Sequence, residues 1–195
     1  MIINTGARTD TVQYYTTWLL KRFEEGYAYS RNPLFPNKVT RYELTPEKVD
    51  CVVFCSKDYE PILADLETIT SQFPTYFHYT ITAYGTDVEP GAPSIEKSME
   101  TLERLSALVG KQRVAWRYDP VLLTDRYTVE THLETFERMA RELSPHVDRC
   151  IFGFVEMYKR LEKNMPELIP LTDGDKDALA QGLGEIAARY DLPIQ

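Results

Sequence analysis

The chain has 195 residues, a net charge of −8 and a hydrophobic content of 43%, which suits one globular domain burying roughly 70% of its unfolded surface. The acidic balance argues against general nucleic-acid binding, because proteins of that class usually carry a basic excess. No apolar run approaches the roughly 18 residues of a membrane span, and the Met1–Asn4 start does not resemble a signal peptide. We therefore expect no membrane partner and a cytoplasmic location.

The first half of the chain alternates strand-like and helix-like segments. Residues 2–5 predict a strand, and Asp10 then begins a helix that ends at Gly26, because aspartate is a favoured N-cap and glycine a favoured stop. Tyr14, Trp18, Leu19 and Phe23 recur in this segment at the spacing of a helix. The segments that follow are a hairpin of 27–30 with 39–44 around a proline-rich loop, a buried strand over 51–55 and a helix over 61–69.

The second half repeats this alternation. Its predicted strands are 76–82, 113–117 and 149–155, its helices begin at 94, 128 and 172 or 173, and 192–195 begins a further strand. Strand-then-helix repetition predicts a parallel sheet with right-handed crossovers. A closed eight-unit barrel takes about 250 residues. We therefore predict an α/β fold, a partial or open TIM-like (βα) barrel with a mainly parallel sheet of about six strands, as one domain over 1–195.

Polar residues gather where the predicted strands end, and the carboxyl ends of parallel strands build the ligand site in such folds. The side chains expected to meet there are Arg8, Asp10, Lys57, Thr82, Arg117, Asp119 and Glu156. The cations would bind a small anionic ligand, with Arg31 of the proline loop adding positive charge. Asp119, Glu156 and Asp10 are the catalytic candidates, because acid–base chemistry needs carboxylates held near cations.

Each of these residues also has a structural interpretation. Asp10 suits an N-cap, and Arg117 with Asp119 suits an ion pair that ties a loop. Glu156 would be a buried carboxylate that needs a basic partner. His78, among aromatic residues in a strand, is typical of a core histidine.

The three cysteines, Cys51, Cys55 and Cys150, fall on strand-like segments and suggest reduced, buried thiols. On a strand, Cys51 and Cys55 would lie about 13 Å apart, at roughly 3.3 Å per residue. One metal ion cannot bind both, so we predict no metal site and no cofactor in this chain.

Several clusters, in this order, carry a resemblance to a known family. They are Arg8-Thr9-Asp10, Arg31-Asn32-Pro33, Thr80-Ile81-Thr82-Ala83-Tyr84-Gly85, Trp116-Arg117-Tyr118-Asp119-Pro120 and Phe154-Val155-Glu156-Met157-Tyr158. Over essentially its whole length the chain resembles the uncharacterised bacterial family catalogued as domain of unknown function 1848. The resemblance adds Asn32, Tyr84 and Tyr158 to the expected ligand-binding residues.

The resemblance implies a radical-SAM-like barrel. Family members usually continue into a C-terminal cysteine cluster thought to hold an iron–sulfur centre, and this chain stops before it, as a truncated product or as a member without the cluster. A [4Fe-4S] cluster and S-adenosylmethionine are therefore implied only if a cysteine-bearing continuation exists. Departures from the family pattern are Ala7 in place of an arginine, Cys55-Ser56-Lys57-Asp58 in place of Trp-Thr-Lys-Asn, and Glu156 in place of an aspartate.

Three hypotheses for function follow. The first is an enzyme domain that binds a small anionic or polar molecule at the carboxyl-terminal rim of the strands. The second is the barrel portion of a radical-SAM-like iron–sulfur enzyme. The third is a non-catalytic binding module or homo-oligomer that meets its partner through the open sheet edge, because unpaired strand edges seek cover.

Overall fold

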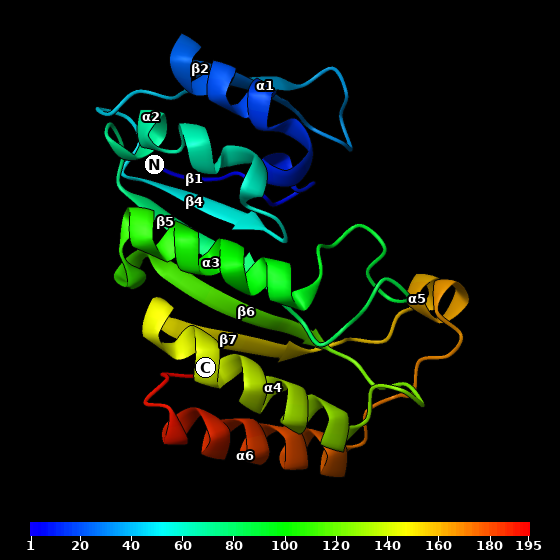
Figure 1. Cartoon of the computed structure of the whole chain (residues 1–195). Helices are drawn as coiled ribbons and strands as arrows, with labels where there is room; N and C mark the ends of the chain where they lie inside the picture. The colour runs from blue at the N-terminus through cyan, green and yellow to red at the C-terminus, as the bar shows by residue number, and fades with distance from the viewer. The chain divides into compact units, whose positions relative to one another are not determined.

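A computed structural model describes all 195 residues and contains a mainly parallel sheet with helices around it (Figure 1). The strands are β1 (Ile2–Asn4), β2 (Tyr27–Arg31), β3 (Val39–Glu43), β4 (Cys51–Ser56), β5 (Thr75–Thr80), β6 (Val114–Val121) and β7 (Arg149–Phe154). The five-stranded sheet has the order β1-β4-β5-β6-β7, and β2 pairs with β3 in a separate antiparallel hairpin. The predicted α/β class, the parallel sheet and the hairpin are confirmed.

The longer helices are α1 (Thr11–Glu25), α3 (Ile95–Val109), α4 (Val129–Leu143) and α6 (Asp173–Arg189). The shorter ones are α2 (Glu67–Thr70), α5 (Lys159–Asn164) and the 3-10 helices η1 (Glu60–Asp65), η2 (Lys111–Arg113) and η3 (Ser144–His146). The helix predicted over 61–69 is wrong in type, because most of this stretch is 3-10 helix with Pro61 at its start. The sequence did not predict α5.

The chain divides into two compact units, Met1–His78 and Tyr79–Gln195. In unit 1, β1 runs parallel to β4 with Ile2 opposite Cys51. The α1 helix begins as predicted, with the Asp10 side chain accepting from Gln13 N, and it ends at Gly26, whose φ of 73° is the left-handed conformation that glycine adopts readily.

The four residues whose spacing indicated α1 do not share one face of the helix. Tyr14 is 60% exposed and Trp18 46% exposed, whereas Val12, Leu19 and Phe23 are buried. At about 100° per residue, the three buried side chains fall within a narrow arc, and positions 14 and 18 lie on the far side of the helix. Helical spacing alone did not distinguish these two faces.

In unit 2, β6 and β7 run parallel, with Arg117 opposite Ile151. Ser94 and Thr128 cap α3 and α4 as predicted, and of the two candidates for α6 the cap is Thr172. The α6 helix packs against α4, and α5 lies beyond the arrowheads of β6 and β7 (Figure 1). β6 extends four residues further than predicted, with an irregularity in its pairing between Tyr118 and Val121. The predicted strand at the end of the chain is reduced to a parallel bridge between Ile194 and Cys150.

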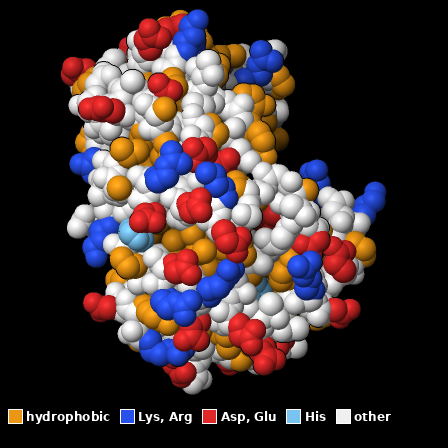
Figure 2. All heavy atoms as spheres, in the orientation of Figure 1, with side chains coloured by type: hydrophobic (Ala, Val, Ile, Leu, Met, Phe, Trp, Pro, Cys, Tyr) orange, Lys and Arg blue, Asp and Glu red, His pale blue; other side chains and the backbone are white.

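The surface differs between the two units in its apolar content. Most of the large hydrophobic side chains that are exposed belong to unit 1, among them Ile2, Leu34 and Phe35. Figure 2 shows acidic and basic side chains interspersed over the visible face, with hydrophobic side chains open to solvent among them. None of the helices has both the length and the apolar character that crossing a membrane requires.

Candidate functional site

Asp10 joins the start of α1 to the end of β4 within unit 1. Its carboxylate accepts hydrogen bonds from Gln13 N at 2.8 Å, Ser56 Oγ at 2.8 Å and Lys57 N at 2.9 Å. The loop before it passes close to β4, and a Cβ added at Gly6 would collide with the backbone of Cys55. Three donors thus fix the carboxylate, so the geometry supports the capping interpretation of Asp10. Its catalytic role stays a prediction.

Replacing Asp10 with alanine should lower the free energy of unfolding by about 1–2 kcal/mol, because the cap of α1 and the link to β4 are both lost. Asp10→Asn should cost less, since asparagine caps helices as well as aspartate does. Urea unfolding followed by circular dichroism measures both. Equal losses in the two variants would show that the cap is not what Asp10 contributes.

A pocket of about 400 Å³ lies in unit 1 beside β1, α1 and the β2–β3 hairpin. Arg8, at the carboxyl end of β1, is one of its lining residues, and its Nη1 donates to the carbonyl oxygen of Arg31 at 2.6 Å. Arg22 lines the same pocket from α1. Two guanidinium groups therefore face one cavity, and of the two only Arg8 was singled out from the sequence.

Asn32 stabilises the turn between β2 and β3. Its side-chain oxygen accepts from Leu34 N at 2.9 Å and from Phe35 N at 3.2 Å. A side chain used in this way shapes the loop. The ligand-binding roles of Arg31 and Asn32 stay predictions.

Arg117 and Asp119 form an ion pair on β6 of unit 2. Both side chains are partly exposed, at 32% and 26%. Gly153 on β7 leaves room for this pair, because a Cβ there would lie 3.0 Å from Asp119 Oδ1. The structural alternative considered for these two residues is thus present, and a partly exposed arginine–carboxylate pair still has donors left for a ligand.

Tyr84 and Tyr127 fix the segment that follows β6. Tyr84 is buried, and its hydroxyl donates to Pro120 O and accepts from Leu122 N, both at 2.8 Å. Both hydrogen-bonding directions of the hydroxyl are therefore used within the protein. This geometry favours a structural role for Tyr84, and its predicted ligand binding is not tested.

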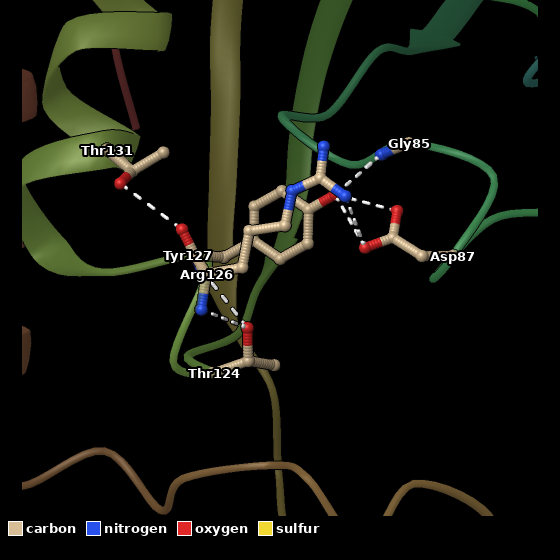
Figure 3. Close-up of polar contacts among 6 residues, drawn as sticks. All are labelled: Gly85, Asp87, Thr124, Arg126, Tyr127 and Thr131. Carbon is tan, nitrogen blue, oxygen red and sulfur yellow. Dashed lines mark hydrogen bonds and ion pairs between the residues drawn. The ribbon is translucent and has the colours of Figure 1, made fainter.

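Figure 3 shows the contacts around Tyr127. The Tyr127 hydroxyl donates to Asp87 at 2.8 Å and accepts from Gly85 N at 2.9 Å, while Arg126 pairs with Asp87 at 3.1 Å. The bond from Tyr127 lowers the pKa of the Asp87 carboxyl, which stays ionised within this cluster. The sequence analysis did not identify this cluster, because its members lie on loops about 40 residues apart.

His132 is fully buried in α4 and connects two points of the β6 segment. Its Nδ1 lies 2.7 Å from Tyr118 Oη, and its Nε2 lies 2.8 Å from Leu122 O. A carbonyl oxygen only accepts, so Nε2 carries the proton and Nδ1 accepts from the tyrosine hydroxyl. Burial lowers the pKa of His132 and raises the pKa of Tyr118. The pair is therefore a neutral structural link.

The remaining residues that the sequence predicted for the site differ from one another in burial. Thr82 is buried and Lys57 half-buried, whereas Glu156 and Tyr158 are exposed in the segment after β7. The expectation of a buried Glu156 carboxylate is wrong, because β7 ends at Phe154 and Glu156 lies two residues beyond it. The structure brings Asp10 to Lys57, and Arg117 to Asp119. A common site for residues of both units stays a prediction.

The thiols of this chain do not fit an iron–sulfur centre. Cys51 and Cys55 lie four residues apart on β4, and Cys150 is buried on β7 in the other unit. Burial raises the pKa of Cys51 and of Cys150, which opposes the thiolate form that binds metal. No three His, Cys, Asp or Glu side chains are grouped to hold a metal ion.

Comparison with known proteins gives one family and one kind of fold. The sequence model of a family described as "Domain of unknown function (DUF1848)" matches residues 2–195. No curated protein matches the chain. Spore photoproduct lyase complexed with dinucleoside spore photoproduct has a TM-score of 0.62 at 13% identity. A double mutant of that lyase with bound AdoMet and dinucleoside spore photoproduct has a TM-score of 0.61 at 13% identity.

Both similarities cover 100% of this chain and 59% of the lyase chain. At such identities the likeness shows the fold alone, and this fold agrees with the radical-SAM-like barrel that the resemblance implied. The chain thus spans about three fifths of the length of these structures.

Proposed function

This chain belongs to the family described as a domain of unknown function (DUF1848), and we propose that it binds a small anionic molecule in the unit 1 pocket. The observation that supports this is the Arg8 guanidinium at the carboxyl end of β1, in the lining of a cavity of about 400 Å³. That volume lies within the roughly 300–1,000 Å³ of small-molecule sites.

The charge around the pocket suits an anion. Arg8 uses one donor on Arg31 O and keeps further N–H groups for a ligand. The hairpin adds Arg31 and Lys38, while its Arg41 pairs with Glu43 at 3.2 Å. In a chain with a net charge of −8, Arg8, Arg31 and Lys38 thus provide local positive charge beside this pocket. Asp10, which lies in unit 1, is the acid–base candidate for a substrate of this pocket, and the catalytic roles of Asp119 and Glu156 in unit 2 stay separate predictions.

Arg8→Ala should weaken binding of inorganic pyrophosphate to the chain about tenfold or more, because a charge-assisted hydrogen bond is lost. Isothermal titration calorimetry at low ionic strength measures the affinity. Arg141→Ala is the matched control, since Arg141 is an exposed arginine of α4 that does not line the pocket. Wild-type affinity in the Arg8 variant, or no pyrophosphate binding by the wild-type chain, would refute the proposal.

The second candidate is the barrel portion of a radical-SAM-like enzyme. The fold match that covers the whole chain favours it. The residues present here do not hold a cluster, so this candidate depends on a cysteine-bearing continuation in the same reading frame. The gene sequence past the codon for Gln195 and the iron content of the anaerobically purified product test it. A stop codon there, with no iron in the protein, would exclude this candidate.

A further inference from the structure

Two polar atoms in the lining of the unit 1 pocket are buried without a hydrogen-bond partner. They are Nε of Arg22 on α1 and Oγ1 of Thr5 just after β1. A buried donor without an acceptor is costly, and most such groups in proteins are paired. The Nη1 atom of the same guanidinium group forms an ion pair with Glu25 Oε2 at 2.9 Å. Both atoms therefore keep hydrogen-bonding capacity that the protein itself does not use.

The same pocket has aromatic walls. Trp18 lines it from α1 and Tyr42 from β3, whereas Tyr29 belongs to the opposite face of the hairpin, because Tyr42 pairs with Ala28 and Tyr29 with Arg41. Trp18 and Tyr42 are large side chains that remain 46% and 40% exposed, although aromatic side chains of this size are usually mostly buried. The Arg22 guanidinium lies 5.9 Å from the Trp18 ring centroid and 5.7 Å from the Tyr27 ring centroid. Flat rings and guanidinium planes are the surfaces on which nucleobases stack.

The aromatic side chains and the guanidinium groups line the same cavity, with Arg8 in the loop that follows β1. A sugar phosphate would satisfy Arg8 and leave the aromatic side chains of Trp18 and Tyr42 exposed. A neutral aromatic molecule would cover the rings and leave Arg8 without an anion. Only a ligand that joins a planar ring to an anionic group uses both.

We infer that the unit 1 pocket binds a mononucleotide, whose base stacks on Trp18 and Tyr42 and whose phosphate pairs with Arg8. This inference rests on the proposed anion site and adds the ligand class. Arg22 Nε and Thr5 Oγ1 donate to acceptors on the base or the ribose. Binding a single nucleotide needs only a local basic pocket, which an acidic chain can contain. It does not require the broad basic surface of a nucleic-acid binder.

The two tryptophans of the chain make the test selective. Trp18 is half-exposed in the pocket, and Trp116 is fully buried in unit 2. Titration with AMP should quench the fluorescence of Trp18, and Trp18→Phe should remove the quenching. Calorimetry with AMP and with ribose 5-phosphate then compares a ligand that carries the base with one that lacks it. We expect AMP to bind about tenfold or more tightly than ribose 5-phosphate, as base stacking provides.

Matched variants show which side chains produce the difference in affinity between AMP and ribose 5-phosphate. Trp18→Leu should bring the affinity for AMP close to that for ribose 5-phosphate, while Trp18→Phe should keep most of the difference because its ring still stacks. Arg22→Lys should weaken AMP binding, because it keeps the charge and loses Nε. Tyr14→Leu is the control, since Tyr14 is an exposed aromatic residue of α1 outside the pocket lining.

The outcomes separate this inference from the proposed function. Equal affinities for AMP and ribose 5-phosphate would overturn the nucleotide inference and leave anion binding in place. Tighter AMP binding that Trp18→Leu does not affect would also overturn it, since the base would then lie elsewhere. Failure of both ligands and of pyrophosphate to bind at millimolar concentration would overturn the inference and the proposed function together.

Discussion

Replacing Trp116 with alanine is expected to lower the free energy of unfolding by about 3–5 kcal/mol, the cost of removing a fully buried aromatic side chain. The Trp116 ring stacks on Phe136 with centroids 4.9 Å apart and meets Tyr118 edge-on at 5.7 Å. Its Nε1 donates to Ile81 O at 2.9 Å. The indole therefore joins β6 to α4 and to the segment after β5, and its loss leaves a cavity at the centre of unit 2.

Trp116→Phe separates packing from hydrogen bonding. It keeps a ring against Phe136 and leaves Ile81 O without its donor, so a smaller loss of about 1–3 kcal/mol is expected. Urea unfolding followed by circular dichroism measures both variants. Leu108→Ala, at a position 61% exposed on α3, is the control and should stay within about 0.5 kcal/mol of the wild type. A similarly small change in Trp116→Ala would contradict the assignment of this core.

Replacing His132 with leucine should destabilise the protein by about 2–4 kcal/mol near neutral pH. Leucine fills part of the same space, but Leu122 O loses its donor, and Tyr118 Oη keeps only a 3.5 Å contact to the backbone oxygen of residue 132. Unpaired buried polar groups cost about 1–3 kcal/mol each. Chemical denaturation at pH 7.5 measures the loss. A variant as stable as the wild type would mean that the link between β6 and α4 contributes nothing.

His132 should also make the stability of the wild type depend on pH. Burial lowers its pKa below the ordinary value of about 6.5, although the bond to Leu122 O acts in the opposite direction. The unfolded chain then takes up a proton at a pH where the folded chain does not. Stability is therefore fully present above about pH 6.5 and falls as the pH decreases through that value, by up to about 1.4 kcal/mol per pH unit.

The matched comparison is the slope of stability against pH between 7.5 and 5.5 in the wild type and in His132→Leu. The leucine variant lacks the titrating group, so its slope should be smaller. Carboxylates titrate mainly below this range, which keeps their contribution out of the comparison. Identical slopes would show that His132 takes up its proton equally in the folded and unfolded chains.

The amino-acid sequence by itself determined the order and type of most elements. Asp10, Ser94, Thr128 and Thr172 cap helices where their side chains and spacing predicted, since a cap is a contact within one turn. The alternation of strand and helix similarly implied a parallel sheet, because parallel strands need a crossover between them. The clusters from Arg8 to Tyr158 indicated the family that the sequence match confirms.

Only the tertiary structure decided which polar and aromatic side chains meet. The pocket joins Arg8, Trp18 and Tyr42, which come from a loop, a helix and a hairpin. His132 meets Tyr118 across 14 positions, and Tyr84 meets Leu122 across 38. Periodicity and capping report on neighbours within a few residues, so they did not distinguish the exposed Trp18 from the buried Leu19 on α1 and left His132 without a role. Contacts between distant segments depend on how the elements pack, and it is this packing that exposes Glu156 and buries His132.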